Sequence, residues 1–408
     1  MSSETITIDG IAAGGDGVGR LADGRAVFVP RTVPGDVVIL DPERLERRRS
    51  YARGQVAELL QRGSDRVAAP CAHYEGDRCG GCQLQHLAYP AQLRVKGRIV
   101  GDALRRIGKL DLADPVVEAA PHPFRYRTKI VLSAGPRGLG LSGGERTGGV
   151  FPLDDCQLAD GRLMAVWHWL RSGRALLPRD VRRLVLRLDR EDRVHVVVET
   201  RGPAWRDATR LRDADPPHSL VCWWQPVGGA PRVVAGPEPG FSATAFEPIN
   251  PAVDASVRAW ATAALGEVAG RVVWDLYGGS GDAAAMLAAR GAQVVSVDAD
   301  EGAVAWARRR AMSSPVRFIA GRVEDVVARL PAAGAAVLNP PREGLHWDVT
   351  LHVTAVPVPR IVYVSRDPAT LARDLARLAA VYRVVGVRAF DLLPQTAHAA
   401  VVAVLDAA

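Results

Sequence analysis

The sequence predicts a multidomain α/β protein in which three folding units follow one another along the chain. A small all-β barrel comes first, because residues 4–60 alternate short apolar runs with turn signals. A central α+β unit follows, and from residue 250 onward strands alternate with helices, which indicates a doubly wound, mostly parallel sheet. We place the three units at residues 1–64, 65–245 and 246–408.

The composition is that of a globular protein with an excess of basic residues. It is 48% hydrophobic and 24% charged, with a formal net charge of +7. The positive charge suggests a polyanionic partner, although a general preference for arginine would have the same effect. The N-terminus is polar and no run of about 18 apolar residues occurs, so we expect neither a signal peptide nor a membrane span. We therefore expect a cytoplasmic protein that acts as a monomer.

The N-terminal unit carries a basic arm. Five arginines fall between residues 44 and 53. Such a run is either a solvated strand or loop, or a surface that grips RNA. The RNA-binding candidates in this arm are Arg47, Arg48 and Arg49.

The cysteines suggest a metal centre. In a chain with few cysteines, three of them lie within twelve residues, a pattern that does not fit a disulfide framework. Zinc is one occupant, with His73 or His86 completing the ligands, and an iron–sulfur cluster is the other. The spacing alone leaves both open, while Cys222 stands apart. The four candidate ligands are Cys71, Cys79, Cys82 and Cys156.

The central unit mixes helices and strands. A spaced apolar face predicts a helix over 84–110, and a second helix is expected at Leu158–Leu170. The Pro/Gly-rich stretch Val227–Gly240 is expected to be a loop. Strands are expected at Ile130–Ser133, Val181–Leu188, Val194–Glu199 and Leu220–Trp224.

The C-terminal unit has the alternating pattern of a parallel sheet covered by helices. Helices are expected at 251–268, 282–290, 301–312, 322–330 and 368–380. Strands are expected at 271–275, 293–298, 316–320, 335–339 and 360–365. The final apolar runs, Tyr382–Phe390 and Ala399–Val404, follow each other directly and predict an antiparallel hairpin.

The stretch Val272–Asp298 reads as strand, glycine-rich turn, helix and second strand. Glycines in the turn let a ligand lie against bare backbone, and an acid closing the second strand can accept hydrogen bonds from a ribose diol. The third glycine of a dinucleotide fold is missing, and the spacing resembles motif I of class I S-adenosylmethionine (SAM) methyltransferases. The cofactor-binding candidates are Asp275, Tyr277, Gly279, Gly281, Asp298 and Asn339.

Further motifs resemble one family over the whole chain. The string Cys79-Gly-Gly-Cys-Gln-Leu-Gln-His, followed by Gln92 and Lys96, resembles the cluster segment of the TRAM-containing uracil-5 RNA methyltransferases. The glycine-rich string that begins at Gly14 resembles the TRAM domain, an OB-like RNA-binding module. Two other strings match in register: Tyr126-Arg127-Thr128-Lys129 and Phe246-Glu-Pro-Ile-Asn250.

The resemblance implies two cofactors and a partner. The cofactors are SAM and a [4Fe–4S] cluster, for which Cys156 is the matching fourth ligand. The partner is structured RNA, either ribosomal or transfer RNA. Arg127 and Lys129 become RNA-binding candidates on the same ground.

The catalytic pair of that family is missing. In the family a cysteine thiolate adds to uracil C6, and a carboxylate later removes the C5 proton. The string Tyr363-Val-Ser-Arg-Asp-Pro puts Arg366 at the nucleophile position, and the base position is Ala400. The family's Gln, Asp and Cys at three further positions are replaced by Pro248, Asn339 and Gly278.

Three hypotheses remain open. The first is a SAM-dependent RNA methyltransferase with altered chemistry, whose acceptor carries its own lone pair and in which His398 is a candidate base. The second is a non-catalytic RNA-binding or assembly factor that keeps the fold. The third, a small-molecule methyltransferase, is disfavoured by the RNA-binding barrel. Methylation of uracil C5 by the family route is not expected, because arginine stays protonated and cannot attack C6.

Overall fold

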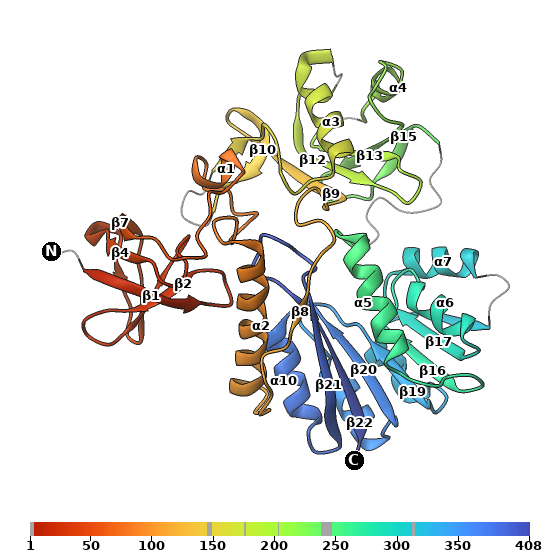
Figure 1. The fold of residues 1–408 in the computed structure, drawn as a ribbon. Coiled ribbons are helices and arrows are strands. Elements are labelled where there is room, and N and C mark those ends of the chain that lie inside the picture. Colours follow the sequence, from red (N-terminus) through yellow and green to blue (C-terminus); the bar gives the residue numbers. More distant parts are fainter. Residues whose placement is uncertain (1–3, 145–148, 175–176, 203, 238–246, 312–314) are drawn as a thin grey trace.

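The structure is a computed structural model that describes residues 4–144, 149–174, 177–202, 204–237, 247–311 and 315–408. Three β-sheets follow one another along this part of the chain (Figure 1). The protein is therefore a multi-sheet α/β molecule, as the sequence predicts. The ranges of the three units, 1–64, 65–245 and 246–408, stay a prediction.

The N-terminal sheet is small and mostly antiparallel. Its residues alternate inward and outward, and Ile6, Ile8, Val27 and Val38 meet in an apolar centre. Among the described residues its strand order is β5-β6-β3-β2-β1-β4-β7. The elements are β1 (Thr5–Ile11), β2 (Gly17–Arg20), β3 (Ala26–Val29), β4 (Val37–Leu40), η1 (Pro42–Arg44), β5 (Glu46–Arg47), β6 (Tyr51–Arg53) and β7 (Val56–Gln61).

The central sheet has the order β11-β10-β9-β12-β13-β14-β15 in the described part of the chain. The four strands expected from sequence are present with small changes at their ends, but the stretch expected to be a loop contains the edge strand β15. Residues 238–240 of that stretch, and Phe246, lie outside the described residues. The elements are α1 (Ala72–Glu75), β9 (Lys129–Gly135), β10 (Gly138–Ser142), β11 (Val150–Pro152), α3 (Gly161–Trp169), η2 (Leu170–Arg174), β12 (Val181–Leu188), β13 (Val194–Thr200), α4 (Ala208–Arg212), β14 (Leu220–Pro226) and β15 (Arg232–Ala235).

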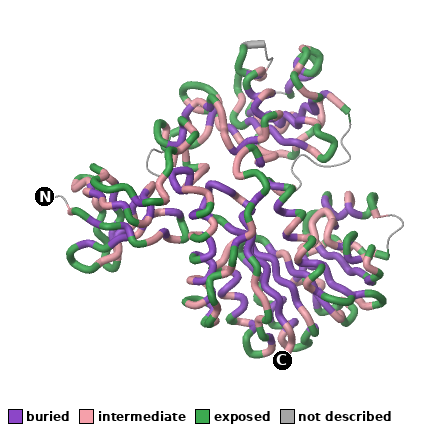
Figure 2. The backbone as a smooth tube through the Cα atoms, in the orientation of Figure 1, coloured by how far each residue is buried: buried purple, intermediate pink, exposed green. Residues whose placement is uncertain are grey.

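The C-terminal sheet has the described strand order β18-β17-β16-β19-β20-β22-β21-β8. β16 to β20 are parallel, and β22 runs antiparallel to both β20 and β21, which confirms the predicted hairpin. The strands of this sheet are buried along most of their length (Figure 2). The helix α5 (Pro251–Ala263) precedes the first of its parallel strands in the chain. The remaining elements are β16 (Val272–Leu276), α6 (Asp282–Ala289), β17 (Gln293–Asp298), α7 (Glu301–Arg310), β18 (Val316–Ala320), α8 (Val323–Val326), η3 (Val327–Arg329), β19 (Ala335–Leu338), α9 (Trp347–Ala355), β20 (Arg360–Ser365), α10 (Pro368–Leu378), β21 (Tyr382–Phe390) and β22 (Ala400–Ala407).

Two elements from the middle of the chain pack onto the C-terminal sheet. The helix α2 (Tyr89–Arg106) lies against α10, and β8 (Val117–Glu118) extends the sheet by pairing with β21. The segment that follows the cysteine-rich stretch, which contains α2 and β8, therefore packs as part of the C-terminal unit. Among the described residues, no helix combines the length and the apolar character needed to cross a membrane.

Candidate functional site

The glycine-rich turn after β16 has the conformation expected of a ligand-binding turn. Gly279 and Gly281 have φ angles of 55° and 75°, in the left-handed region that favours glycine. The backbone N–H of Gly279 donates to a carboxylate oxygen of Asp298 at 2.7 Å. The turn, the start of α6 and the end of β17 therefore meet, and they bring Gly279, Gly281 and Asp298 together. Tyr277 lies half-buried at the start of the turn, with a φ of 62°.

Asp275 lies beneath this turn. It is 1% exposed, and Ser296 Oγ donates to its Oδ2 at 2.8 Å. Burial raises the pKa of Asp275 to about 6, against an ordinary value of 3.8. A Cβ at Gly278 would lie 2.3 Å from Asp275 Oδ2, so the pair leaves no room for a side chain there. Asp275 therefore supports the turn from below.

Arg366 and Asn339 lie at the carboxyl ends of the adjacent strands β20 and β19. One guanidinium nitrogen of Arg366 donates to Asn339 Oδ1 at 2.9 Å, and the other donates to Asp254 Oδ1 at 3.1 Å. Asp254 also pairs with Arg258, one turn further along α5. Because a guanidinium has only donors, the amide oxygen of Asn339 must face Arg366. Burial and the neighbouring Arg342 lower the pKa of Arg366, which is still a cation at neutral pH.

The base position faces the same edge of the sheet. Ser365 pairs with Val401, so Ala400 at the start of β22 lies across from the end of β20. Ala400 is 1% exposed and is part of an apolar cluster. His398 is accessible to solvent, and the partial burial of its ring, together with the nearby Arg342, lowers its pKa. These positions lie near the carboxyl ends of β19 and β20 and the start of β22: Asn339, Arg342, Arg366, His398 and Ala400.

The four clustered cysteines lie close enough for their charges to interact. Cys71 precedes α1, Cys79 and Cys82 lie in the following loop, and Cys156 follows β11. The backbone N–H of Gly81 donates to Cys79 Sγ at 3.5 Å. Within the described ranges, no three or more His, Cys, Asp or Glu residues are placed to hold one metal ion.

The two histidines near these cysteines are fully engaged. His86 contacts Tyr74 Oη and the carbonyl of Thr32 through its two ring nitrogens, at 2.7 and 3.2 Å. His73 contacts Asp77 at 2.6 Å and accepts from the backbone N–H of Asp154 at 3.0 Å. Since both nitrogens of each ring have partners, the hypothesis of a zinc site completed by a histidine is not supported.

The RNA-binding candidates fall into two groups. Arg127 is half-buried beside the cysteines and donates to the carbonyl of Gly81 at 3.3 Å. Lys129 is half-buried in β9, opposite Arg187, and burial lowers its pKa. Neither lies on an open surface. In contrast, the basic arm is exposed, with Arg47 paired to Glu4, Arg48 paired to Glu46, and Arg49 beside them.

Hydrogen bonds join the cysteine-rich segment to the loop 391–396, which directly precedes His398 and Ala400 in the chain. The backbone N–H groups of Gln83 and Leu84 both donate to the carbonyl of Gln395 at 3.0 Å. The side chain of Gln92 donates to Gln395 Oε1 at 2.9 Å and accepts from its backbone N–H at 3.1 Å. Sequence reasoning marked Gln92 but missed its partner, because the two residues are 303 positions apart.

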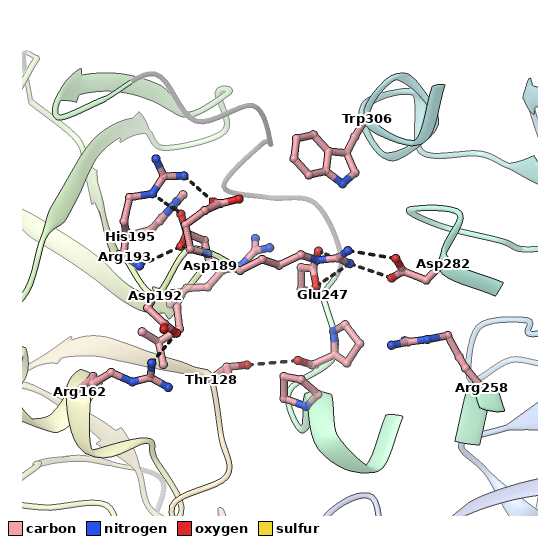
Figure 3. A pocket seen from close by; sticks show the side chains of 16 residues that line it. Thr128, Arg162, Asp189, Asp192, Arg193, His195, Glu247, Arg258, Asp282 and Trp306 are labelled. Atoms are coloured by element: carbon pink, nitrogen blue, oxygen red, sulfur yellow. Dashed lines mark hydrogen bonds and ion pairs between the residues drawn. The ribbon is translucent and has the colours of Figure 1, made fainter. Parts of the chain in front are cut away.

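A cavity of about 740 Å³ lies between the β12–β13 turn and the helices α5, α6 and α7 (Figure 3). Arg190, Glu247 and Asp282 lie on its walls together with Trp306. Sequence reasoning did not identify this cavity. Glu247 does belong to the string that resembles the family motif, which was the one available signal.

Comparison with known proteins agrees with this arrangement. The family model described as tRNA (Uracil-5-)-methyltransferase matches residues 310–407. An uncharacterized RNA methyltransferase of Gloeobacter violaceus is 33% identical, over 98% of this chain and 96% of its own. The 23S rRNA (uracil(1939)-C(5))-methyltransferase of Halomonas elongata is 32% identical, over 96% of this chain and 87% of its own.

A solved structure shows the same fold. The tRNA (uracil-54, C5)-methyltransferase of Pyrococcus abyssi, in complex with S-adenosyl-L-homocysteine, has a TM-score of 0.74. It is 23% identical, and the match covers 98% of this chain and 99% of that one. The resemblance drawn from the motifs is confirmed over the whole length: the chain belongs to the RNA (uracil-5) methyltransferase family.

Proposed function

We propose that the protein binds SAM and structured RNA, ribosomal or transfer RNA, and does not methylate uracil C5 through a cysteine adduct. The observation that carries this proposal is the placement of Arg366, which donates to Asn339 and Asp254 at the nucleophile position. Ala400 begins the strand that pairs with β20, one residue before Val401, the partner of Ser365, and its methyl side chain offers no proton acceptor. Covalent C5 methylation needs a thiolate and a base at these two positions.

An acceptor that carries its own lone pair does not need these two groups. An exocyclic amine or a ribose hydroxyl needs positioning and charge stabilisation, without a covalent intermediate. His398 is exposed beside Arg342 and is the candidate group to receive a proton there. The second candidate function is an RNA-binding or assembly factor without transfer activity. The ion pair of Arg366 with Asp254 favours it, because the side chain at the nucleophile position is held by a structural partner.

SAM fits the turn after β16. Asp298 accepts a hydrogen bond from Gly279 in the ligand-free turn, and the same carboxylate can accept from the ribose diol. The related Pyrococcus abyssi structure contains S-adenosyl-L-homocysteine, which supports this ligand class. We place the cofactor contacts at Gly279, Gly281 and Asp298, with Tyr277 and Asn339 beside them and Asp275 beneath.

The four cysteines fit a [4Fe–4S] cluster. A [4Fe–4S] cluster is held by four cysteine thiolates, and Cys71, Cys79, Cys82 and Cys156 supply that number. Gln85 Nε2 donates to Cys82 Sγ at 3.1 Å, a contact of the kind that tunes cluster thiolates. When bound, such a cluster supplies a structural link and a redox centre. Iron and sulfide analysis of anaerobically purified protein should find about four of each; stoichiometric zinc would contradict this assignment.

The N-terminal sheet, residues 1–64, is proposed to be a TRAM-type RNA-binding domain. Its exposed arm should contact phosphates, so changing Arg47, Arg48 and Arg49 to Glu should weaken binding across RNA sequences. The salt dependence should flatten by about one unit per lost phosphate contact. A matched control changes three exposed arginines at α4, namely Arg206, Arg210 and Arg212. An equal loss in both variants would move the RNA surface away from the arm.

The proposed function is tested by incubating the protein with SAM and with ribosomal and transfer RNA, followed by nucleoside mass spectrometry. Calorimetry with SAM is measured in parallel. Binding of SAM without formation of 5-methyluridine supports the proposal, and a different methylated nucleoside names the acceptor. Formation of 5-methyluridine contradicts it. Absence of SAM binding favours the second candidate function.

A further inference from the structure

Arg190 links the central sheet to the cofactor turn. It lies in the turn between β12 and β13, and its guanidinium donates to both carboxylate oxygens of Asp282, at 3.0 and 2.8 Å. It also donates to Glu247 at 3.3 Å (Figure 3) and to Ser280 Oγ at 3.2 Å. Asp282 is the first residue of α6, directly after Gly281. A cation from another sheet is thus fixed at the turn.

These three charged groups face a cavity of suitable size. Arg190, Glu247 and Asp282 all line the space of about 740 Å³, which falls within the range of about 300–1,000 Å³ for small-molecule sites. Their side chains keep contact with solvent, being 34%, 19% and 18% exposed. A ligand that reaches the turn can therefore touch all three.

Asp282 does not depend on Arg190 alone. Arg310 donates to its Oδ1 at 2.9 Å, and Ser280 Oγ donates to its Oδ2 at 3.2 Å. Burial raises the pKa of Asp282, but hydrogen bonds from Arg190 and Arg310 outweigh it and hold the pKa at about 2. Asp282 is therefore an anion at neutral pH, and it keeps partners when Arg190 turns toward a ligand.

We infer that Arg190, Glu247 and Asp282 recognise the amino-acid end of SAM. That end is a zwitterion, which requires a cation and an anion side by side. Arg190 pairs with the α-carboxylate through its two-pronged guanidinium, and Glu247 and Asp282 receive the α-ammonium. The inference rests on the proposed SAM site, where Asp298 holds the ribose. Arg190 is then a specificity residue that the central sheet contributes to the cofactor site.

Two other arginines of the cavity, Arg162 and Arg193, pair within the central unit. Arg162 pairs with Asp160 and Asp192, and both acids belong to the central unit. Arg193 pairs with Asp189 and Glu191 within its own turn. Arg162 is therefore a matched control, since it lines the same cavity while its ion-pair partners belong to the central unit.

The experiment compares two ligands by calorimetry on the full chain. S-Adenosylhomocysteine carries the amino-acid end, whereas 5′-methylthioadenosine keeps the adenosine and the thioether but lacks it. Arg190→Ala should weaken binding of S-adenosylhomocysteine by about 10- to 100-fold and change binding of methylthioadenosine by less than about threefold. Arg190→Lys should recover part of the lost affinity for S-adenosylhomocysteine, because lysine restores the positive charge but not the two parallel N–H donors of the guanidinium. Arg162→Ala should match the native protein for both ligands.

Each other outcome has a distinct meaning. Equal losses for both ligands in Arg190→Ala would show that Arg190 only maintains the shape of the turn, which overturns the inference. Unchanged affinity for S-adenosylhomocysteine would overturn it as well. If the native protein binds neither ligand, the proposed SAM site itself is wrong, and the inference fails with it.

Discussion

Gly278 occupies a position where the packing of two polar side chains excludes a Cβ. An added Cβ would lie 2.3 Å from Asp275 Oδ2 and 2.4 Å from Ser296 Oγ. We expect Gly278→Ala to lower the thermal midpoint, with a loss of about 1–3 kcal/mol from overpacking. Gly161→Ala is the control, because nothing lies within 4 Å of its added Cβ. Equal midpoints for the two variants would show that the turn yields without cost.

Asp275 makes stability depend on pH. Its folded pKa of about 6 lies above the ordinary 3.8, so the folded state holds this proton more tightly than the unfolded state does. The stabilising contribution is complete below about pH 4 and is lost as the pH rises through about 6. Asp275→Asn cannot ionise, so it should gain on the native protein by up to about 3 kcal/mol between pH 4 and pH 7. A difference in thermal midpoint that does not change with pH would contradict the burial of this carboxyl.

At the scale of elements, α2 fastens the loop 391–396 through a buried ion pair. Lys96 and Asp391 are both fully buried and paired, and Lys96 Nζ also donates to the carbonyl of Leu393 at 3.0 Å. Lys96→Met leaves a buried carboxylate without its cation and should cost about 3–5 kcal/mol. Lys96→Met with Asp391→Asn should cost less than the two single changes together.

Thermal unfolding of the four proteins of this cycle measures the coupling. Hydrogen exchange should show faster exchange at the loop 391–396 in Lys96→Met than in the native protein, because the loop loses its anchor. Additive costs and unchanged exchange would mean that the loop is held by other contacts.

The elements that sequence reasoning missed depend on tertiary contacts. The helix α9 contains Val349, Thr350 and Val353, whose branched side chains lower helix propensity; they are buried in the structure. The strand β15 lies in a Pro/Gly-rich stretch and exists through its pairing with β14. In both cases packing against the rest of the fold overrides the local pattern.

The site was predictable where its residues are close in sequence. The glycines of the turn and Asp298 lie within one strand–turn–helix–strand unit, and the structure brings Gly279 into direct contact with Asp298. Arg190 and Asp282 are 92 residues apart, one in the β12–β13 turn and the other in α6, so no local sequence pattern predicts their pairing. The role of Asp275 also required the structure, because burial beneath the turn cannot be read from spacing.

At the scale of the whole molecule, the cysteine-rich segment joins the N-terminal sheet to the C-terminal one. Ile11, Leu84 and Ala397, one from each part, share a buried apolar cluster. A Cβ at Gly15 would lie 2.6 Å from Gln83 Cβ, which shows how closely the glycine-rich loop approaches this segment. Loss of the proposed cluster would therefore disturb the contacts that hold all three parts together.

Under the proposed function, this family member has lost covalent uracil chemistry. The family's route traps RNA that carries 5-fluorouracil, because fluorine at C5 cannot leave as a proton does, and the trap requires a thiolate at C6. Arg366→Cys alone should not give turnover, since Ala400 offers no base; Arg366→Cys with Ala400→Glu tests whether the pair acts as a unit.

The most direct measurement mixes the native protein with 5-fluorouracil RNA and SAM and analyses the products on a denaturing gel. A uracil-5 methyltransferase with the family's cysteine at this position is the positive control, and the mass of any adduct is checked by intact-protein mass spectrometry. We predict no denaturation-resistant adduct, because Arg366 offers a fixed cation in place of a nucleophile. A covalent adduct with the native protein would contradict the account.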